Sequence, residues 1–270
     1  MIHSRDGLTE FSERYFQVLS TKTFGREVKW LESAGSTNDI ARVWADEGAP
    51  EGALVFADHQ VAGRGRHGRT WTASPGQNLT ISIVLRPRME VDHLGLVSLA
   101  AGVAVADTLV SCCPGHRVTL KWPNDVRIEG RKCCGILLES SYVSSREATT
   151  LILGIGLNVN QRAFEGELSN LATSMALASG KRVEREEILA LLVSHLEERY
   201  GQSIREPGRI ISDYESLLDW VGQPVRVHEA SGRPMAKGLL LGVDGTGALI
   251  LQTHDGRRTY HAGEVTLQTK

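Results

Sequence analysis

The longest apolar stretch of the chain constrains its fold more than any other feature. Residues 93–113 are almost all apolar or small, and Pro114 and Gly115 follow them, a pair that ends a helix. A helix that is apolar nearly all round must be covered on most of its sides. Asp107 and the many small residues favour a buried helix over a membrane span. We therefore predict a helix over about residues 92–113 on which a sheet packs.

Strand and helix patterns surround this apolar stretch. The predicted strands are residues 28–31, 53–57, 79–85, 118–122, 126–128, 132–138 and 151–160. The predicted helices are a short one within residues 1–24, one that begins at Ser36 or Thr37 and ends at Gly48, and those over residues 168–178, 185–200 and 209–218. These patterns favour one large domain over residues 1–220, in which a sheet packs on helices.

The hydrophobic period changes to two near residue 220. Short strands are predicted over residues 224–227, 236–243, 248–251 and 264–267, with turn residues between them. About 50 residues with this pattern are typical of a small all-β barrel. We therefore predict a second domain over residues 221–270.

Composition excludes several classes of protein. The chain has 270 residues and a formal net charge of -2, which argues against general binding to nucleic acid or to a membrane surface. The N-terminus lacks the apolar core of a signal peptide. The four cysteines form two adjacent pairs rather than a C-x-x-C, so we expect free thiols and a reducing, cytoplasmic location.

A basic, glycine-rich segment lies between the strands over residues 53–57 and 79–85. Its glycines and arginines alternate within seven positions: Gly63, Arg64, Gly65, Arg66, Gly68 and Arg69. Glycine N–H groups can approach a ligand closely, and arginine matches the geometry of phosphate and carboxylate. Trp71 adds a flat aromatic face. The segment therefore suits an anionic ligand that carries a ring.

The segment has three other interpretations. The glycines spell G-x-G-x-x-G, but a dinucleotide site needs a helix at the third glycine, and residues 70–76 read as a turn. An arginine-glycine segment can bind nucleic acid without catalysis, although such segments usually repeat and this one occurs once. A solvated basic loop is the simplest alternative.

Two further features have both a structural and a ligand-binding interpretation. Ser36 or Thr37 can cap the helix that follows, or bind a polar ligand at its N-terminus. Gly154 and Gly156 leave one face of their strand bare, so something packs flat against it, either a helix or a ligand.

The motifs together resemble the biotin protein ligases, also called biotin–acetyl-CoA-carboxylase ligases. The matching segments are residues 36–38, Gln60 with residues 63–69 and Trp71, residues 121–125, residues 131–132 with 135–137, and residues 154–159. They lie in the family's order over about residues 30–160. The resemblance implies an α+β fold, in which a mixed sheet of the class II synthetase type packs on helices, with a C-terminal SH3-like barrel.

The resemblance also implies an activity. Such enzymes activate biotin with ATP and Mg²⁺ to biotinyl-5′-AMP and transfer biotin to a lysine of a biotin carboxyl carrier protein. A lipoate or octanoate ligase or transferase shares the fold and is the alternative, although the polar residues 36–38 and Gln60 favour a ureido ring over an acyl chain. A homodimer is compatible with the family. We expect no DNA-binding domain before the catalytic motifs and hence no repressor activity, and the net charge of -2 agrees with neither DNA nor a membrane as a partner.

Site residues follow from the matched motifs. The residues expected to bind biotin are Ser36, Thr37, Asn38, Gln60, Gly63, Arg64, Gly65, Arg66, Lys132, Gly135, Gly154 and Gly156. Those expected to bind ATP are Arg66, His67, Trp71, Lys121, Asn124, Asp125 and Asn158. The catalytic cations would be Arg66, Lys121 and Lys132. The motifs identify no metal ligands.

Two positions depart from the family pattern. His67 stands where some members have arginine, so its charge depends on pH. Cys133 and Cys134 replace small or aliphatic residues beside Lys132; one of them is a candidate reactive thiol, and buried packing is the alternative.

Overall fold

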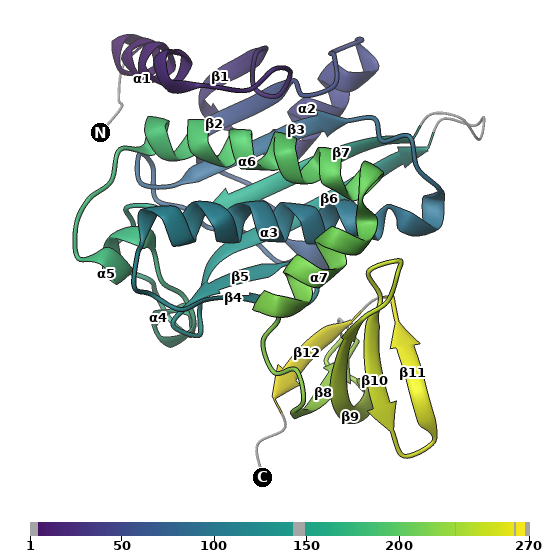
Figure 1. Ribbon diagram of the computed structural model, residues 1–270. Helices are drawn as coiled ribbons and strands as arrows, with labels where there is room; N and C mark the ends of the chain where they lie inside the picture. The colour runs from purple at the N-terminus through teal and green to yellow at the C-terminus, as the bar shows by residue number, and fades with distance from the viewer. Residues whose placement is uncertain (1–4, 143–148, 230, 262, 268–270) are drawn as a thin grey trace.

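A seven-stranded mixed sheet forms the centre of the larger domain in the computed structural model, which describes residues 5–142, 149–229, 231–261 and 263–267 (Figure 1). Its strands are β1 (Val28–Ala34), β2 (Leu54–Gln60), β3 (Leu79–Leu85), β4 (Val118–Lys121), β5 (Asp125–Ile128), β6 (Arg131–Tyr142) and β7 (Thr149–Leu157). Their order is β1-β2-β3-β7-β6-β5-β4, and only β1 and β2 are parallel among these neighbours. The predicted mixed sheet is confirmed, and the basic segment joins two adjacent strands, β2 and β3.

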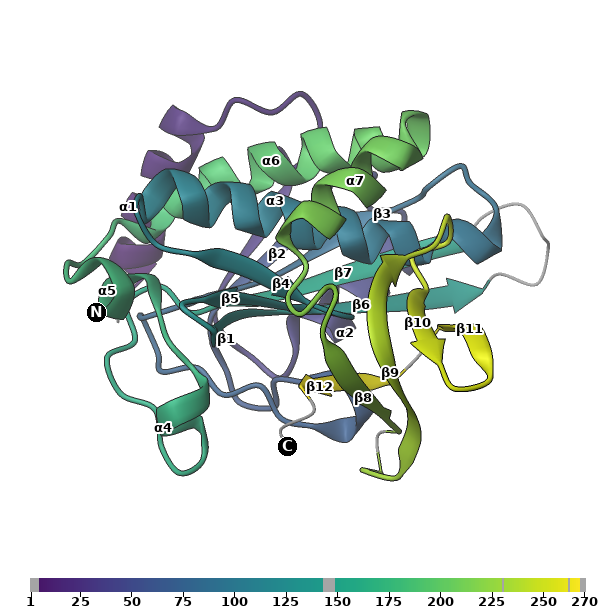
Figure 2. The same ribbon diagram turned by 60° about the horizontal axis from the view of Figure 1, so that its bottom comes forward.

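Helices cover both faces of this sheet. The helices α3 (Gly95–Cys112), α6 (Arg185–Arg205) and α7 (Pro207–Leu217) lie on one face, and α2 (Thr37–Asp46) lies on the other (Figure 2). Alternate strand residues divide between the two layers: Phe56 belongs to the main core, whereas Val55 packs with Ala41 of α2. The helix α3 is long and apolar enough to cross a membrane, but most of it is buried between the sheet, α6 and α7. Its burial explains its apolar surface.

The predicted helix over residues 168–178 is wrong. The structure has two short helices there, α4 (Leu168–Leu171) and α5 (Met175–Ser179). The chain between them extends, because Ala172 forms a β-bridge with Lys132 and the Thr173 N–H donates to the Lys132 carbonyl at 2.8 Å. Ser174 then caps α5 by accepting from the Leu177 N–H. Contacts with the distant strand β6 therefore replace the helical hydrogen bonds at the break.

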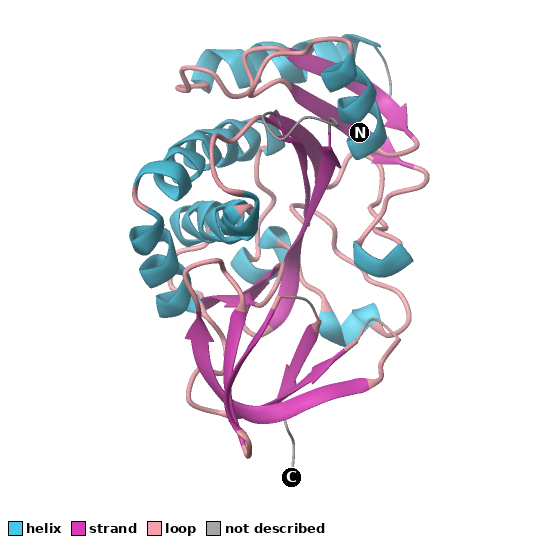
Figure 3. Cartoon of the chain, turned by 90° about the vertical axis from the view of Figure 1, so that its right-hand side faces the viewer, coloured by secondary structure: helices cyan, strands magenta, loops and turns pink. Residues whose placement is uncertain are grey.

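A five-stranded antiparallel sheet forms the C-terminal unit, as expected for an SH3-like barrel (Figure 3). Its strands are β8 (Pro224–His228), β9 (Pro234–Val243), β10 (Leu249–Thr253), β11 (Gly256–Tyr260) and β12 (Glu264–Leu267). The strand β11 was not predicted, because its residues are polar and largely exposed, as in many edge strands. The predicted boundary between domains falls in the chain between α7 and β8, and residues 1–4 and 268–270 of the predicted domains lie outside the described residues.

The C-terminal unit is attached to the large domain by specific polar contacts. Trp122, which is 3 % exposed, donates its indole N–H to the carbonyl of Gly247 at 3.1 Å. The backbone N–H of Val243 donates to Glu215 of α7 at 2.9 Å. The barrel therefore sits against the end of the sheet where β4 and β5 meet.

Aromatic packing holds the N-terminal helix α1 (Arg5–Val18), and one carboxylate holds the loop that follows it. Phe11 stacks on Phe56 of the sheet with ring centroids 4.9 Å apart. Beyond the helix, Glu197 of α6 accepts hydrogen bonds from three consecutive backbone N–H groups, those of residues 22–24, at 2.6–2.9 Å. Burial raises the pKa of this carboxyl, but the three hydrogen bonds outweigh it, and the net shift is downward.

We predict that Glu197→Gln lowers the free energy of unfolding at neutral pH by about 1–3 kcal/mol, because a charged acceptor of three N–H groups is replaced by a neutral one. A lowered native pKa stabilises the fold above the ordinary value of 4.5, and this contribution disappears as pH falls through the native pKa. Urea unfolding at several pH values measures it. Glu198→Gln, on an exposed neighbour, is the control. A deficit that persists in acid would contradict the assignment.

Candidate functional site

A cavity of about 350 Å³ lies on the large domain beneath the glycine-arginine segment. It is lined by the start of α2, by β6 and β7, and by the turn between β4 and β5. All but two of the predicted site residues line it; the exceptions are Gly63 and His67. Segments far apart in the sequence therefore meet in one place, as the motifs predicted.

The basic segment is folded as a hairpin. Arg64 and Thr70 form an antiparallel bridge, and the N–H of Trp71 donates to the carbonyl of Gly63 at 2.9 Å. A Cβ on Gly63 would lie 2.4 Å from the carbonyl oxygen of Trp71, so this position needs glycine. His67 is exposed at the tip with a φ of 58°. Gly63 and His67 thus shape the hairpin rather than line the cavity.

Trp71 and Asn38 fill the bare face of β7. A Cβ on Gly156 would lie 2.3 Å from the indole of Trp71, and one on Gly154 would lie 2.3 Å from Oδ1 of Asn38. The expectation that something packs flat against this strand is confirmed, and the packing groups are these two side chains. The indole also lies close to Gly135, where a Cβ would be 3.1 Å from it. The indole nitrogen is buried and has no acceptor among the described residues.

At the start of α2 the hydroxyl of Thr37 bonds to other side chains, and that of Ser36 does not cap the helix. Ser36 occupies the N-cap position, but its side chain makes no capping hydrogen bond. The N–H and Oγ1 of Thr37 donate to Oε1 of Gln60 at 2.7 and 3.0 Å. Ser82 of β3 joins the same buried group, with its Oγ 2.7 Å from Thr37 Oγ1. One end of the cavity is therefore a connected polar network.

Cations gather toward the other end of the cavity. Lys132 forms an ion pair with Asp125 at 2.6 Å, and its Nζ lies 5.7 Å from the centre of a Trp71 ring. Lys121 also lines the cavity. Arg66 reaches the C-terminal barrel, where its Nη1 is 3.5 Å from the carbonyl oxygen of Gly263. Such cations can stabilise negative charge that develops on a bound anion.

Two asparagines leave acceptor oxygens at the cavity. Asn124 donates its amide N–H to the carbonyl of Ile136 at 2.8 Å. Asn158, which is 3 % exposed, donates to the carbonyl of Thr173 at 3.0 Å, and its Oδ1 is buried without a partner in the described part of the chain. No group of three or more His, Cys, Asp or Glu residues suited to a metal ion occurs among the described residues.

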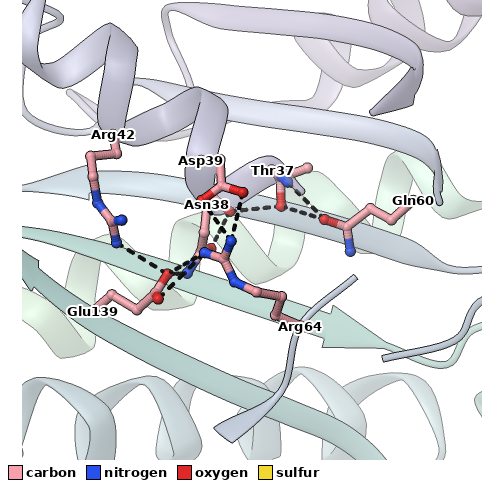
Figure 4. Close-up of polar contacts among 8 residues, drawn as sticks. Thr37, Asn38, Asp39, Arg42, Gln60, Arg64 and Glu139 are labelled. Carbon is pink, nitrogen blue, oxygen red and sulfur yellow. Dashed lines mark hydrogen bonds and ion pairs between the residues drawn. The ribbon is translucent and has the colours of Figure 1, made fainter. Parts of the chain in front are cut away.

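Three charged residues beside the cavity were not predicted from the sequence: Asp39, Arg42 and Glu139. The guanidinium of Arg64 donates to both carboxylate oxygens of Asp39 at 2.6–2.7 Å and to Glu139 at 3.1 Å (Figure 4). The guanidinium of Arg42 lies 3.3 Å from the carboxylate of Glu139. The hydrogen bond to Asp39 is the main reason why the pKa of Arg64 is raised. Glu139 lies two positions beyond Leu137 and four beyond Gly135, so all three project from the same face of β6. This alternation was the signal in the sequence that could have identified Glu139.

Both cysteines beside Lys132 are packing residues in the structure. Cys133 and Cys134 are fully buried, and burial raises the pKa of both thiols above the ordinary value. Cys113 is also buried, and burial raises its pKa to about 11. All four cysteines are free. Because the thiolate is the nucleophile, Cys133 and Cys134 are unsuited to react with solvent reagents in the native fold.

Comparison with known families matches both parts of the chain. Residues 30–158 match the biotin/lipoate A/B protein ligase family, and residues 221–267 match the biotin protein ligase C-terminal domain. The first match contains every predicted site residue, from Ser36 to Asn158.

Individual relatives agree with these matches. The chain is 32 % identical to the biotin–[acetyl-CoA-carboxylase] ligase of Mycobacterium tuberculosis over 92 % of each protein. It is 33 % identical to the bifunctional ligase/repressor BirA of Bacillus subtilis over 92 % of this chain and 76 % of the relative. Among solved structures, the biotin protein ligase of Aquifex aeolicus in complex with biotin and ATP superposes with a TM-score of 0.77 at 28 % identity, over 91 % of this chain and all of that one.

We predict that Gly156→Ala displaces the indole of Trp71 and destabilises the fold by about 1–3 kcal/mol, because the added methyl group overlaps the ring. Tryptophan emission, compared with that of a Trp71→Phe protein, should show a more exposed indole. Gly208→Ala is the control, since nothing lies near its Cβ position. Unchanged emission from Gly156→Ala would contradict the close contact.

Proposed function

The chain belongs to the biotin/lipoate A/B protein ligase family, and we propose that its cavity joins biotin to ATP and passes the biotinyl group to a lysine of a carrier protein. The observation that carries this proposal is the composition of the cavity. A buried polar network lies at one end and a group of cations lies toward the other, beneath an arginine-bearing hairpin. Relatives named for this activity cover most of the chain.

The first step joins two anions. The carboxylate oxygen of biotin attacks the α-phosphorus of ATP, the bond to the β-phosphate oxygen breaks, and pyrophosphate leaves with that electron pair. The product is the mixed anhydride biotinyl-5′-AMP. Arg66, Lys121 and Lys132 supply positive charge where negative charge builds up on the phosphate. Trp71 offers a flat face against which adenine can stack, and the unpaired Oδ1 of Asn158 offers it or the ribose an acceptor.

The cavity has residues that would hold the Mg²⁺ ion that accompanies the nucleotide. This ion is commonly bound by one or two carboxylates together with substrate phosphates, so a dedicated cluster of protein ligands is not required. Asp125 and Asn124 would hold it, because their oxygens line the cavity beside the cations. When bound, Mg²⁺ would neutralise phosphate charge. The carboxylate of Asp125 would then be shared between Lys132 and the ion.

The second step transfers the acyl group. The neutral amine of the carrier lysine attacks the carbonyl carbon of biotinyl-5′-AMP, the bond to the phosphate oxygen breaks, and AMP leaves. The hairpin over residues 63–71 covers the cavity and limits access of water to the anhydride. A ligand that orders this hairpin further must offset about 1–2 kcal/mol for each residue it fixes.

The polar end of the cavity distinguishes biotin from lipoate or octanoate. A ureido ring has one acceptor and two donors, and the side chains of Ser36, Thr37 and Gln60 can pair with such groups. An acyl chain leaves those groups unpaired, at a cost of about 1–3 kcal/mol for each one buried. The site therefore favours biotin. A cytoplasmic location, a homodimer and the lack of DNA binding are further proposals, which fractionation, gel filtration and DNA titration test.

The central prediction is biotin-dependent release of pyrophosphate from ATP in the presence of Mg²⁺. Purified protein is incubated with labelled ATP and with biotin, lipoate or octanoate, and pyrophosphate is counted. Biotin should give the fastest release. Release that does not depend on biotin, or that is faster with either acyl substrate, would refute the proposed substrate.

Lys132→Ala should slow formation of biotinyl-5′-AMP by about 10²–10³-fold, because it removes a cation from the position where phosphate charge develops. Biotin affinity should change by less than about threefold, since Lys132 lies outside the polar network. Single-turnover kinetics and calorimetry separate the two effects. Lys181→Ala, on the exposed loop before α6, is the control. A wild-type first step in Lys132→Ala would remove this residue from the mechanism.

A further inference from the structure

The carboxylate of Glu139 lies beside the cavity and contacts three side chains, two from α2 and one from the hairpin (Figure 4). We propose that Glu139 is a positioning residue that fixes the direction of the hydrogen bonds at the polar end of the cavity and anchors the hairpin to that end. The proposal rests on the proposed function, because it assigns this polar end to biotin. Glu139 itself does not line the cavity.

The direction of the network begins at Asn38. Glu139 accepts a hydrogen bond from the amide nitrogen of Asn38 at 2.6 Å. An ionised carboxylate can only accept, so Asn38 must turn its Nδ2 toward Glu139 and its Oδ1 away. The Oδ1 then accepts from Ser82 Oγ at 2.5 Å. The reverse orientation would place two oxygens against each other in a site where Asn38 is 3 % exposed.

The same direction extends from Asn38 to Ser82, next to Thr37 and Gln60 of the cavity wall. Ser82 is fully buried and has one hydroxyl proton, which Asn38 takes. The backbone N–H of Thr37 donates to Oε1 of Gln60 at 2.7 Å, and the Thr37 hydroxyl lies 2.7 Å from Ser82 Oγ and 3.0 Å from the same Oε1. The acceptor of Gln60 is thereby occupied, and its Nε2 is the group left for a ligand. The backbone N–H of Thr37 therefore fixes the orientation of Gln60, whereas the charge of Glu139 fixes that of Asn38, and the two side chains lie at the same end of the cavity.

Glu139 also connects this network to the hairpin. Arg64 lies 3.1 Å from Glu139 and at 2.6–2.7 Å from both carboxylate oxygens of Asp39. Asp39 shares the hairpin contact, but Asn38 donates only to Glu139 among the hydrogen bonds of the described residues. The two carboxylates therefore separate two roles: both hold Arg64, and Glu139 alone orients Asn38.

The first test compares Glu139→Gln with Asp39→Asn by calorimetric titration of biotin. The glutamine keeps the size of the side chain but can donate, so the Asn38 amide is free to turn over. Glu139→Gln should weaken biotin binding by about tenfold, as expected for a misoriented buried hydrogen-bond network. The KM for ATP and the Tm should remain close to the wild-type values. Asp39→Asn removes an equal charge beside Arg64 and should leave biotin affinity within about twofold.

The second test is a rescue. Asn38→Asp alone opposes two carboxylates and should weaken biotin binding more than Glu139→Gln does. In the double variant Asn38→Asp/Glu139→Gln, the introduced glutamine can donate to the introduced aspartate, whose other oxygen still accepts from Ser82. The double variant should therefore bind biotin more tightly than Asn38→Asp, by about tenfold. A residue that only supports the fold would not produce this recovery.

The outcomes are distinct. Unchanged biotin affinity in Glu139→Gln, an equal loss in Asp39→Asn, or a double variant as weak as Asn38→Asp would each overturn the positioning role. A joint loss of biotin affinity, ATP affinity and Tm in Glu139→Gln would also overturn it in favour of a structural role. A wild-type protein that does not bind biotin would refute the proposed function itself.

Discussion

The close approach of side chains to the backbone of β7 is the constraint on which the site depends. This strand lies between β3 and β6 in the middle of the sheet, where a normal side chain would project into the cavity. Gly154 and Gly156 remove it at two alternate positions, and Asn38 and Trp71 occupy the space. The start of α2 and the last residue of the basic hairpin are thereby seated on one strand. The precision of the site comes from the sheet, and the hairpin adds charge to it.

The charges at the site are held by exchangeable partners. Lys132 is paired with Asp125, and Arg64 with Asp39, before any substrate is considered. Both cations are partly exposed, so each ion pair contributes little stability and mainly holds its cation beside the cavity. When phosphate binds, it competes with a carboxylate for the same cation. The net free energy of phosphate binding is then smaller than the full attraction between phosphate and cation, which suits a site that must also release AMP and pyrophosphate.

The sequence predicted the parts of this fold that local patterns determine. The buried helix, most strands and the cluster of matched motifs were all found, because periodicity and glycine placement are readable over a few residues. The break between α4 and α5 was not, since Ala172 leaves the helix to pair with Lys132, 40 positions away in the chain. The strand β11 escaped because an exposed edge carries no apolar alternation. The period of two along β6 places Glu139 on the face of Gly135, but its partners Asn38 and Arg64 lie in other segments, and that period does not predict which side chains it contacts.

The position of α3 in the chain has a consequence for biosynthesis. This apolar helix is completed at Cys112, but the helices that cover its outer side begin only at Arg185. At about 5–20 residues per second, a ribosome needs roughly 4–15 seconds to make the intervening segment. During that interval the apolar outer side of α3 in the nascent chain is not covered by α6 and α7. We therefore expect chaperones to bind this part of the nascent polypeptide until α6 and α7 have been made.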